Sequence, residues 1–114
     1  MIERQNDAEN PVLLVVTTFP NPDVARQLGA RLVESQLAAC VNLIPAVESI
    51  YRWRERIENE TETVGLLKTT RARLGELEAW LQENHPYEEP EFIAVPVEAG
   101  SAGYLGWVRA GASG

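Results

Sequence analysis

The sequence predicts an α+β domain in which strands and helices follow the order βαββαβ. Four apolar segments rich in β-branched residues are interleaved with two segments whose apolar residues recur every three to four positions. The 114 residues suit one domain with one core. We expect residues 1–10, which are polar and mixed in charge, to form a disordered tail, and residues 11–110 to form the domain.

The first strand is predicted over residues 12–18, where a continuous apolar run indicates burial on both faces. A helix is predicted to follow over residues 22–36. Asn21 suits its N-cap, Pro22 its first position, and Asp23 the positive end of its dipole.

The second and third strands are predicted to form a hairpin. The second strand covers residues 39–53, and Pro45, which cannot donate a ladder hydrogen bond, predicts a bend or bulge within it. The highly polar segment 54–61 is expected to be the connection, and the third strand is expected over residues 63–70.

A second helix is predicted over residues 71–83, and His85 with Pro86 ends it because a residue before proline avoids the helical region. The last strand is predicted over residues 91–97, and a short terminal element over residues 101–110. This order is the ferredoxin-like arrangement, a four-stranded antiparallel sheet with both helices on one face.

The sheet face without helices is predicted to be apolar. In the second strand, Val41 and Leu43 lie at one parity while Ile44 and Ile50 lie at the other, so apolar and polar residues do not alternate. Such a face must be covered, and we expect another copy of the chain to cover it.

The composition argues against several function classes. The net charge of −7 argues against binding to nucleic acids or anionic membranes, where Lys and Arg form the contacts. No apolar run approaches the length of a membrane span, and the N-terminus lacks the apolar core of a signal peptide. Cys40 is the only cysteine, which excludes an intrachain disulfide and favours a reducing compartment.

Five short motifs occur in order along the chain: Ala-Cys-Val-Asn-Leu-Ile-Pro at 39–45, Ser-Ile-Tyr-Arg-Trp at 49–53, Leu-Lys-Thr at 67–69, His-Pro-Tyr-Glu-Glu-Pro-Glu at 85–91, and Tyr-Leu-Gly-Trp at 104–107. With these motifs the chain closely resembles the CutA divalent-cation-tolerance family, from about residue 12 to residue 108.

The resemblance implies a ferredoxin-like homotrimer whose long second and third strands pair between subunits. It also implies a role in the tolerance of copper and other divalent metals, and a cytoplasmic location in bacteria. The trimeric architecture is similar to that of the PII signal proteins, which bind small effectors between subunits. Some copper-binding members have a cysteine where this chain has Thr17, which argues against tight copper binding at that position.

His85, the only histidine, is the first candidate metal ligand, because neutral imidazole commonly binds copper and zinc. Glu88, Glu89 and Glu91 follow at short spacing and are weaker candidates. The chain has no two-histidine or cysteine–histidine cluster, so a strong site would need ligands from more than one subunit. The structural interpretation is that His85 caps the second helix.

Lys68 interrupts an apolar strand, and its ammonium needs a partner, for which Glu91 is a candidate. In one interpretation, Lys68 lines a pocket at the subunit interface with Tyr51, Trp53 and Tyr87. In the other, the lysine forms a structural ion pair at the subunit contact and the aromatic residues pack there.

The sequence leaves two functions open. The leading prediction is a homotrimer that binds copper or other divalent ions, without enzymatic activity and without an obligatory cofactor. The alternative is a PII-like signalling module that binds a small anionic effector at the subunit cleft through Lys68, Arg52 and nearby aromatic residues. An acylphosphatase-type enzyme is disfavoured, because residues 19–22 provide neither Gly nor Arg for an anion-binding loop.

Overall fold

The structure is a computed structural model that describes residues 1–114. It contains the predicted βαββαβ order, with additional elements at both ends. The elements are β1 Ile2–Arg4, β2 Val12–Phe19, α1 Pro22–Glu34, β3 Cys40–Trp53, β4 Arg56–Thr70, a 3-10 turn Arg71–Arg73, α2 Leu74–Asn84, β5 Ile93–Pro96, β6 Ala99–Ser101 and α3 Ala102–Gly111.

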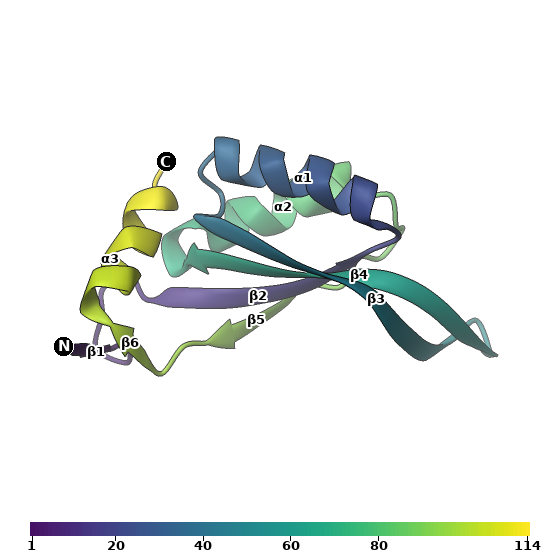
Figure 1. Cartoon of the computed structure of the whole chain (residues 1–114), viewed down its shortest axis with the longest axis horizontal. Coiled ribbons are helices and arrows are strands. Elements are labelled where there is room, and N and C mark those ends of the chain that lie inside the picture. The colour runs from purple at the N-terminus through teal and green to yellow at the C-terminus, as the bar shows by residue number, and fades with distance from the viewer.

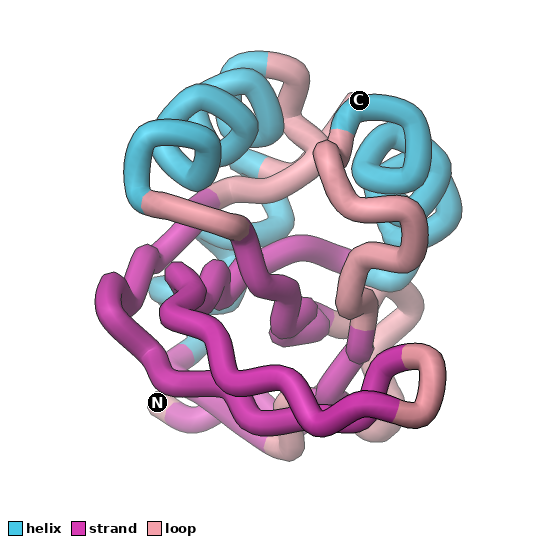
Figure 2. Tube along the Cα trace, turned by 90° about the vertical axis from the view of Figure 1, so that its right-hand side faces the viewer, coloured by secondary structure: helices cyan, strands magenta, loops and turns pink.

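The main sheet confirms the predicted fold class. Its four strands are antiparallel and lie in the order β3-β4-β2-β5. Helices α1 and α2 lie on one face of this sheet, and α3 stands at one end of it (Figure 1). A view along the length of the sheet places the helices above and the strands below (Figure 2). We call the face that α1 and α2 leave uncovered the open face.

The core lies between α1, α2 and the sheet. Val15 and Leu67 pair across β2 and β4, and both are fully buried in the core cluster. Leucines of the two helices complete the cluster, among them Leu32 and Leu77. Because burying a leucine side chain contributes about 1.5–3 kcal/mol, the periodic apolar residues hold the helices on this face.

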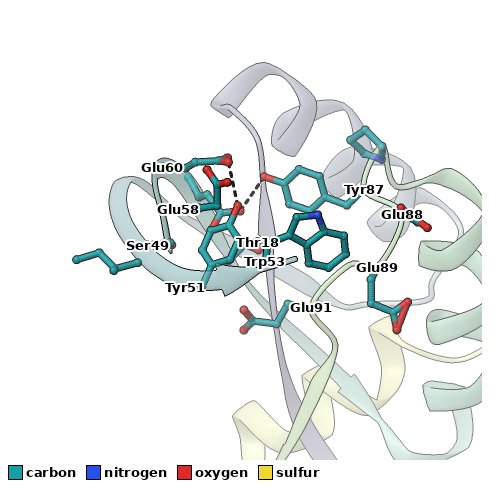
Figure 3. Close-up of a pocket in the computed structure, with 13 residues that line it drawn as sticks. Thr18, Ser49, Tyr51, Trp53, Glu58, Glu60, Tyr87, Glu88, Glu89 and Glu91 are labelled. Carbon is teal, nitrogen blue, oxygen red and sulfur yellow. Dashed lines mark hydrogen bonds between the residues drawn. The ribbon is translucent and has the colours of Figure 1, made fainter. Parts of the chain in front are cut away.

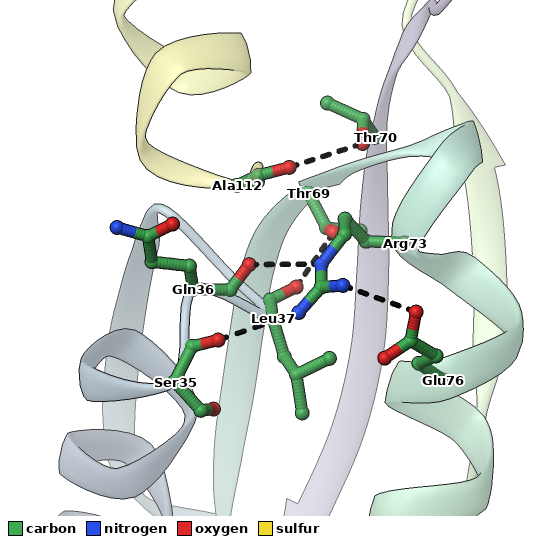
Figure 4. Close-up of polar contacts among 8 residues, drawn as sticks. All are labelled: Ser35, Gln36, Leu37, Thr69, Thr70, Arg73, Glu76 and Ala112. Atoms are coloured by element: carbon green, nitrogen blue, oxygen red, sulfur yellow. Dashed lines mark hydrogen bonds and ion pairs between the residues drawn. The ribbon is translucent and has the colours of Figure 1, made fainter. Parts of the chain in front are cut away.

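Polar contacts join the end of α1 to the start of α2 (Figure 4). The Arg73 guanidinium donates to the carbonyl oxygens of Gln36 at 3.1 Å and Ser35 at 3.3 Å, and it pairs with Glu76 at 3.1 Å. The Thr69 hydroxyl donates to the Leu37 carbonyl at 2.7 Å. These bonds satisfy carbonyls at a helix end, where intrahelical donors are lacking.

Residues 1–10 differ from the expected tail. Strand β1 pairs antiparallel with β6, and the Glu3 carboxylate accepts two hydrogen bonds from Arg109 of α3, each 2.8 Å long. The Gln5 side chain is buried and accepts a hydrogen bond from the Val12 amide at 2.7 Å. The polarity of residues 1–10 did not reveal this packing, because β6 and Arg109, the partners of β1 and Glu3, lie in the distant C-terminal segment.

The connection between β3 and β4 is shorter than expected. Only Arg54 and Glu55 form the turn, both with positive φ (51° and 67°), as in a two-residue type I′ hairpin. The prediction of a polar connection over 54–61 is therefore wrong, because β4 begins at Arg56. The hairpin projects beyond the helices and gives the molecule its length of 47 Å (Figure 1).

The predicted bulge at Pro45 is confirmed. The register of β3 against β4 shifts between Ile44, opposite Val64, and Val47, opposite Glu62. Ala46 within the bulge has a φ of 61°. Since Val64 and Glu62 share a face of β4, the bulge puts Val47 on the same face as Ile44.

The open face is apolar where β2 and β5 pair, as the sequence predicts. Ile93 and Val95 of β5 stand opposite Val16 and Leu14 of β2 on this face, and Ile93 is 53% exposed. Ile44 of β3 adds a further exposed apolar side chain. No helix of the structure has the length and apolar character needed to cross a membrane.

Candidate functional site

A pocket of about 800 Å³ opens between the β3–β4 hairpin and the segment after α2 (Figure 3). Three of the residues that line it are aromatic, and six are glutamates. Its lining residues are Thr18, Ser49, Ile50, Tyr51, Trp53, Glu58, Glu60, Glu62, Pro86, Tyr87, Glu88, Glu89 and Glu91.

The hairpin register positions half of these side chains. Tyr51 stands opposite Glu58, and Ser49 opposite Glu60, so these residues share one face of the hairpin. The bulge at Ala46 decides which face this is. If Ala46 were paired in regular register instead of bulged, Tyr51 and Trp53 would point to the opposite face of the hairpin, away from the glutamates.

Two tyrosines donate hydrogen bonds to glutamates of the pocket, as Figure 3 shows. The Tyr51 hydroxyl donates to Glu60 at 2.9 Å, and the Tyr87 hydroxyl donates to Glu62 at 2.7 Å. The bond to Glu60 raises the pKa of Tyr51 to about 12. Burial, together with the bond to Glu62, raises the pKa of Tyr87. Both hydroxyls therefore stay protonated near neutral pH and keep these carboxylates in place.

His85 supports the wall of the pocket from behind. It is the C-cap residue of α2, which agrees with the structural interpretation of the sequence. Its Nε2 donates to the Thr18 carbonyl at 2.7 Å, and its Nδ1 accepts the Tyr87 amide at 3.0 Å. Its ring also stacks on Phe19 at 5.4 Å between centroids. Burial lowers the pKa of His85, which favours the neutral ring that this bonding pattern requires.

These bonds limit what His85 can do as a metal ligand. With Nε2 protonated toward Thr18 and Nδ1 accepting from Tyr87, neither nitrogen has a free lone pair. The chain also has no group of three His, Cys, Asp or Glu side chains arranged to hold a metal ion. One chain in this conformation therefore does not provide the imidazole-centred site that the sequence suggests.

The glutamates of the pocket lack cationic partners. Among the six, only Glu88 forms an ion pair, with Arg54 at 3.4 Å. The side chains of both Glu88 and Arg54 are largely exposed. Burial, with a smaller contribution from the neighbouring Glu62, raises the pKa of Glu91. No Lys or Arg lines the pocket. The pocket is thus an acidic and aromatic site suited to cations.

Lys68 lies elsewhere. Its ammonium donates to the Tyr104 hydroxyl of α3 at 2.9 Å, and this bond raises the pKa of Lys68. Within this chain it forms no ion pair with Glu91 and does not line the pocket that contains Tyr51, Trp53 and Tyr87, so a pairing or a shared pocket between subunits stays a prediction. The cause is α3, which brings Tyr104 to the end of the sheet.

Sequence reasoning missed the contribution of β4. It placed Glu58 and Glu60 in the polar connection 54–61 and gave Glu62 no role in a site. Their spacing of two residues is the signal that could have identified them, because side chains at i, i+2 and i+4 of a strand share a face.

Comparison with known proteins agrees with this fold. The family model described as CutA1 divalent ion tolerance protein matches residues 13–111. The chain belongs to the CutA1 family. A human relative, Protein CutA, is 46% identical over 92 residues, which cover 81% of this chain and 51% of the human protein. The chain thus spans about half the length of this relative.

Bacterial members of the CutA1 family match over nearly their whole length. The divalent-cation tolerance protein CutA of Thermus thermophilus is 41% identical over 96 residues, covering 84% of this chain and 93% of that protein. A solved structure from T. thermophilus superposes with a TM-score of 0.87 at 38% identity, covering 90% of this chain and 99% of that one. CutA from Synechococcus elongatus gives a TM-score of 0.90 at 36% identity, with coverages of 99% and 96%.

Proposed function

We propose that this chain is a homotrimeric protein that binds divalent cations, copper among them, and does not catalyse a reaction. The observation that carries the proposal is the acidic pocket, whose glutamates have a single ion-pair partner in the chain. Membership of a family named for divalent ion tolerance supports it. We further propose a cytoplasmic location, in agreement with the single free cysteine.

In this proposal, carboxylates are the metal ligands and His85 positions the pocket wall. Glu88, Glu89 and Glu91 lie on the segment that His85 holds through the Tyr87 amide. Because no three ligands of one chain converge, we propose that a neighbouring subunit completes the coordination. The pocket favours cations over the alternative of an anionic effector, because neither Arg52 nor Lys68 lines it.

Self-association follows from the uncovered apolar surface. Strand β3 lies at the edge of the sheet, so one side of its backbone is unpaired. On the projecting hairpin, Ile50 is 67% exposed and Ile57 is 65% exposed. We propose that other copies of the chain cover these residues and the open face, forming a trimer.

Calorimetric titration with copper(II) tests the metal proposal. We expect the Glu89→Gln/Glu91→Gln variant to bind copper at least about tenfold more weakly than the wild type, since each substitution removes a charge-assisted contact with the metal ion. The Glu34→Gln/Glu83→Gln variant loses the same charge from α1 and α2 and should bind like the wild type. Equal affinities in all three proteins would contradict a site in the pocket.

Electron paramagnetic resonance of bound copper tests the role of His85 separately. Coordination by carboxylates alone gives no nitrogen superhyperfine splitting, and this is the expected result. Splitting from one imidazole nitrogen that disappears in His85→Asn would make His85 a ligand. That result would overturn the positioning role.

A further inference from the structure

The pocket has more negative charge than its own chain neutralises. Glu62 is only 8% exposed, and its one hydrogen-bond partner is the neutral Tyr87 hydroxyl. Glu58 and Glu89 form no ion pair at all. A buried carboxylate without a cationic partner costs free energy, which a bound cation would offset.

Aromatic rings share this pocket with the carboxylates. Tyr51, Trp53 and Tyr87 come from β3 and from the segment after α2, and they line the pocket together with the glutamates (Figure 3). Aromatic faces attract cations, and they also pack against methylene groups. A ligand with both ammonium and methylene groups can use the two kinds of wall at once.

The chain already shows this type of recognition beside the pocket. The Arg54 guanidinium lies 5.4 Å from the centroid of Trp53 and 3.4 Å from the Glu88 carboxylate. An organic cation is therefore held between an aromatic face and a carboxylate of the pocket wall. The same chemistry is available deeper in the pocket, where Tyr51 and Tyr87 stand near Glu60 and Glu62.

The arrangement of the carboxylates favours an extended ligand. Glu58, Glu60 and Glu62 come from β4, whereas Glu89 and Glu91 come from the segment before β5, and no three of them converge as ligands of one ion. A divalent ion requires several oxygens within about 2.6 Å. A linear polyamine carries its charges several bonds apart, so each ammonium can reach a different glutamate.

We propose that this pocket binds linear aliphatic polyamines, with their ammonium groups on the glutamates and their methylene chain along Tyr51, Trp53 and Tyr87. The pocket volume of about 800 Å³ is sufficient for such a ligand. The inference goes beyond the proposed function, because it requires no metal ion.

Titration of the metal-free protein with spermidine tests the proposal. The Glu58→Gln/Glu60→Gln variant should bind spermidine at least about tenfold more weakly, since charge-assisted hydrogen bonds are lost. The matched control Glu34→Gln/Glu83→Gln, with the same change of net charge on the helices, should bind like the wild type. If both variants bound spermidine equally weakly, the binding would depend on the overall surface charge and not on the pocket, and the proposal would be overturned.

The aromatic contribution is tested with a second ligand and a second variant. Hexaamminecobalt(III) has the charge of spermidine but no methylene groups, so it should bind more weakly. Trp53→Leu should weaken the binding of spermidine about threefold, because packing of the methylene chain against the ring is lost, and should leave the binding of hexaamminecobalt(III) unchanged. Equal affinity of the two ligands for the wild type would overturn the role of the aromatic walls.

Two further measurements separate the causes of a negative result. Glu89→Gln/Glu91→Gln alters the opposite wall, so it tests the pocket even if the β4 variant unfolds. A copper titration on the same sample reports on the metal proposal. Copper binding without spermidine binding would overturn the polyamine inference alone, and the reverse result would overturn the metal proposal alone.

Discussion

His85 links the buried core to the wall of the pocket. Its neutral ring connects Thr18 of β2 with the Tyr87 amide, so a proton added at Nδ1 would break the second bond. The lowered pKa of His85 reflects its burial. A single ring thus makes the position of the pocket segment sensitive to acid.

The expected pH dependence follows from the direction of this shift. The unfolded chain binds the proton with the ordinary pKa of 6.5, above the lowered pKa of the folded protein. The free energy of unfolding should therefore decrease as pH falls from about 6.5 to the folded-state pKa, with a slope of at most about 1.4 kcal/mol per pH unit.

Urea unfolding of the wild type and of His85→Asn across this pH range measures the effect. Asparagine does not titrate, so its curve should lack the histidine contribution. Parallel pH curves for the two proteins would show that His85 does not cause the loss of stability.

Thr17 carries a buried hydroxyl without a hydrogen-bond partner. The residue is fully buried on the helix-covered side of β2, away from the pocket. Thr17→Val keeps the shape and removes the unpaired group, so we expect it to raise the free energy of unfolding by about 1 kcal/mol.

Thr69→Val is the matched control for this prediction. The Thr69 hydroxyl is equally buried but donates to the Leu37 carbonyl at 2.7 Å. The same substitution should therefore lower the free energy of unfolding by about 1 kcal/mol. Urea unfolding measures both changes, and a loss of stability in Thr17→Val would contradict the assignment of an unpaired hydroxyl.

At the scale of the elements, the bulge in β3 determines the pocket. Ala46 has a φ of 61°, a conformation that costs an L-residue roughly 1 kcal/mol and costs glycine little. Ala46→Gly should therefore increase the free energy of unfolding by about 0.5–1 kcal/mol. Thermal unfolding of this variant provides the measurement.

Ala94→Gly serves as the comparison for the bulge. Ala94 lies in β5, paired in regular register with Val15, and its φ is not positive. Glycine there should lower the free energy of unfolding by about 0.5–1 kcal/mol. If both glycine variants lose stability, the positive φ at Ala46 is not a source of strain.

At the scale of the whole molecule, the open face determines the assembly. Ile93→Lys puts a charge on an apolar face that we propose is covered in the trimer, and burying an unpaired charge costs several kcal/mol. We expect light scattering to give three times the 12.7 kDa chain mass for the wild type and one chain mass for the variant.

Val33→Lys is the control for association. Val33 is also an exposed apolar residue, but it lies on α1, outside the open face. The mass of this variant should equal that of the wild type. A wild type of one chain mass at micromolar concentration would contradict the trimer, and dissociation of both variants would contradict the assignment of the interface.

The fold was predictable because its signals are local. Val15 and Leu67 belong to apolar strands, and Asn21 caps α1 by accepting from the Val24 amide, as its residue type indicates. Pro45 likewise marks the bulge directly. Each feature depends on residues close in sequence, so periodicity and capping rules are sufficient.

The candidate site was predicted only in part. Tyr51, Trp53, Tyr87 and Glu91 were singled out and do meet in one pocket, but Lys68 does not join them. The β4 glutamates were missed, because their role depends on where the hairpin turns. The bonding of His85 to Thr18, far away in sequence, was not visible from the residue type either.

The sequence by itself determined the βαββαβ order, the apolar part of the open face and the family, because each depends on local pattern. Only the tertiary structure decided the partners of His85 and Lys68, the pairing of β1 with β6, and the acidic character of the pocket. Those features join segments distant in the chain. Their physical basis is the strand register and helix packing, which no single segment specifies.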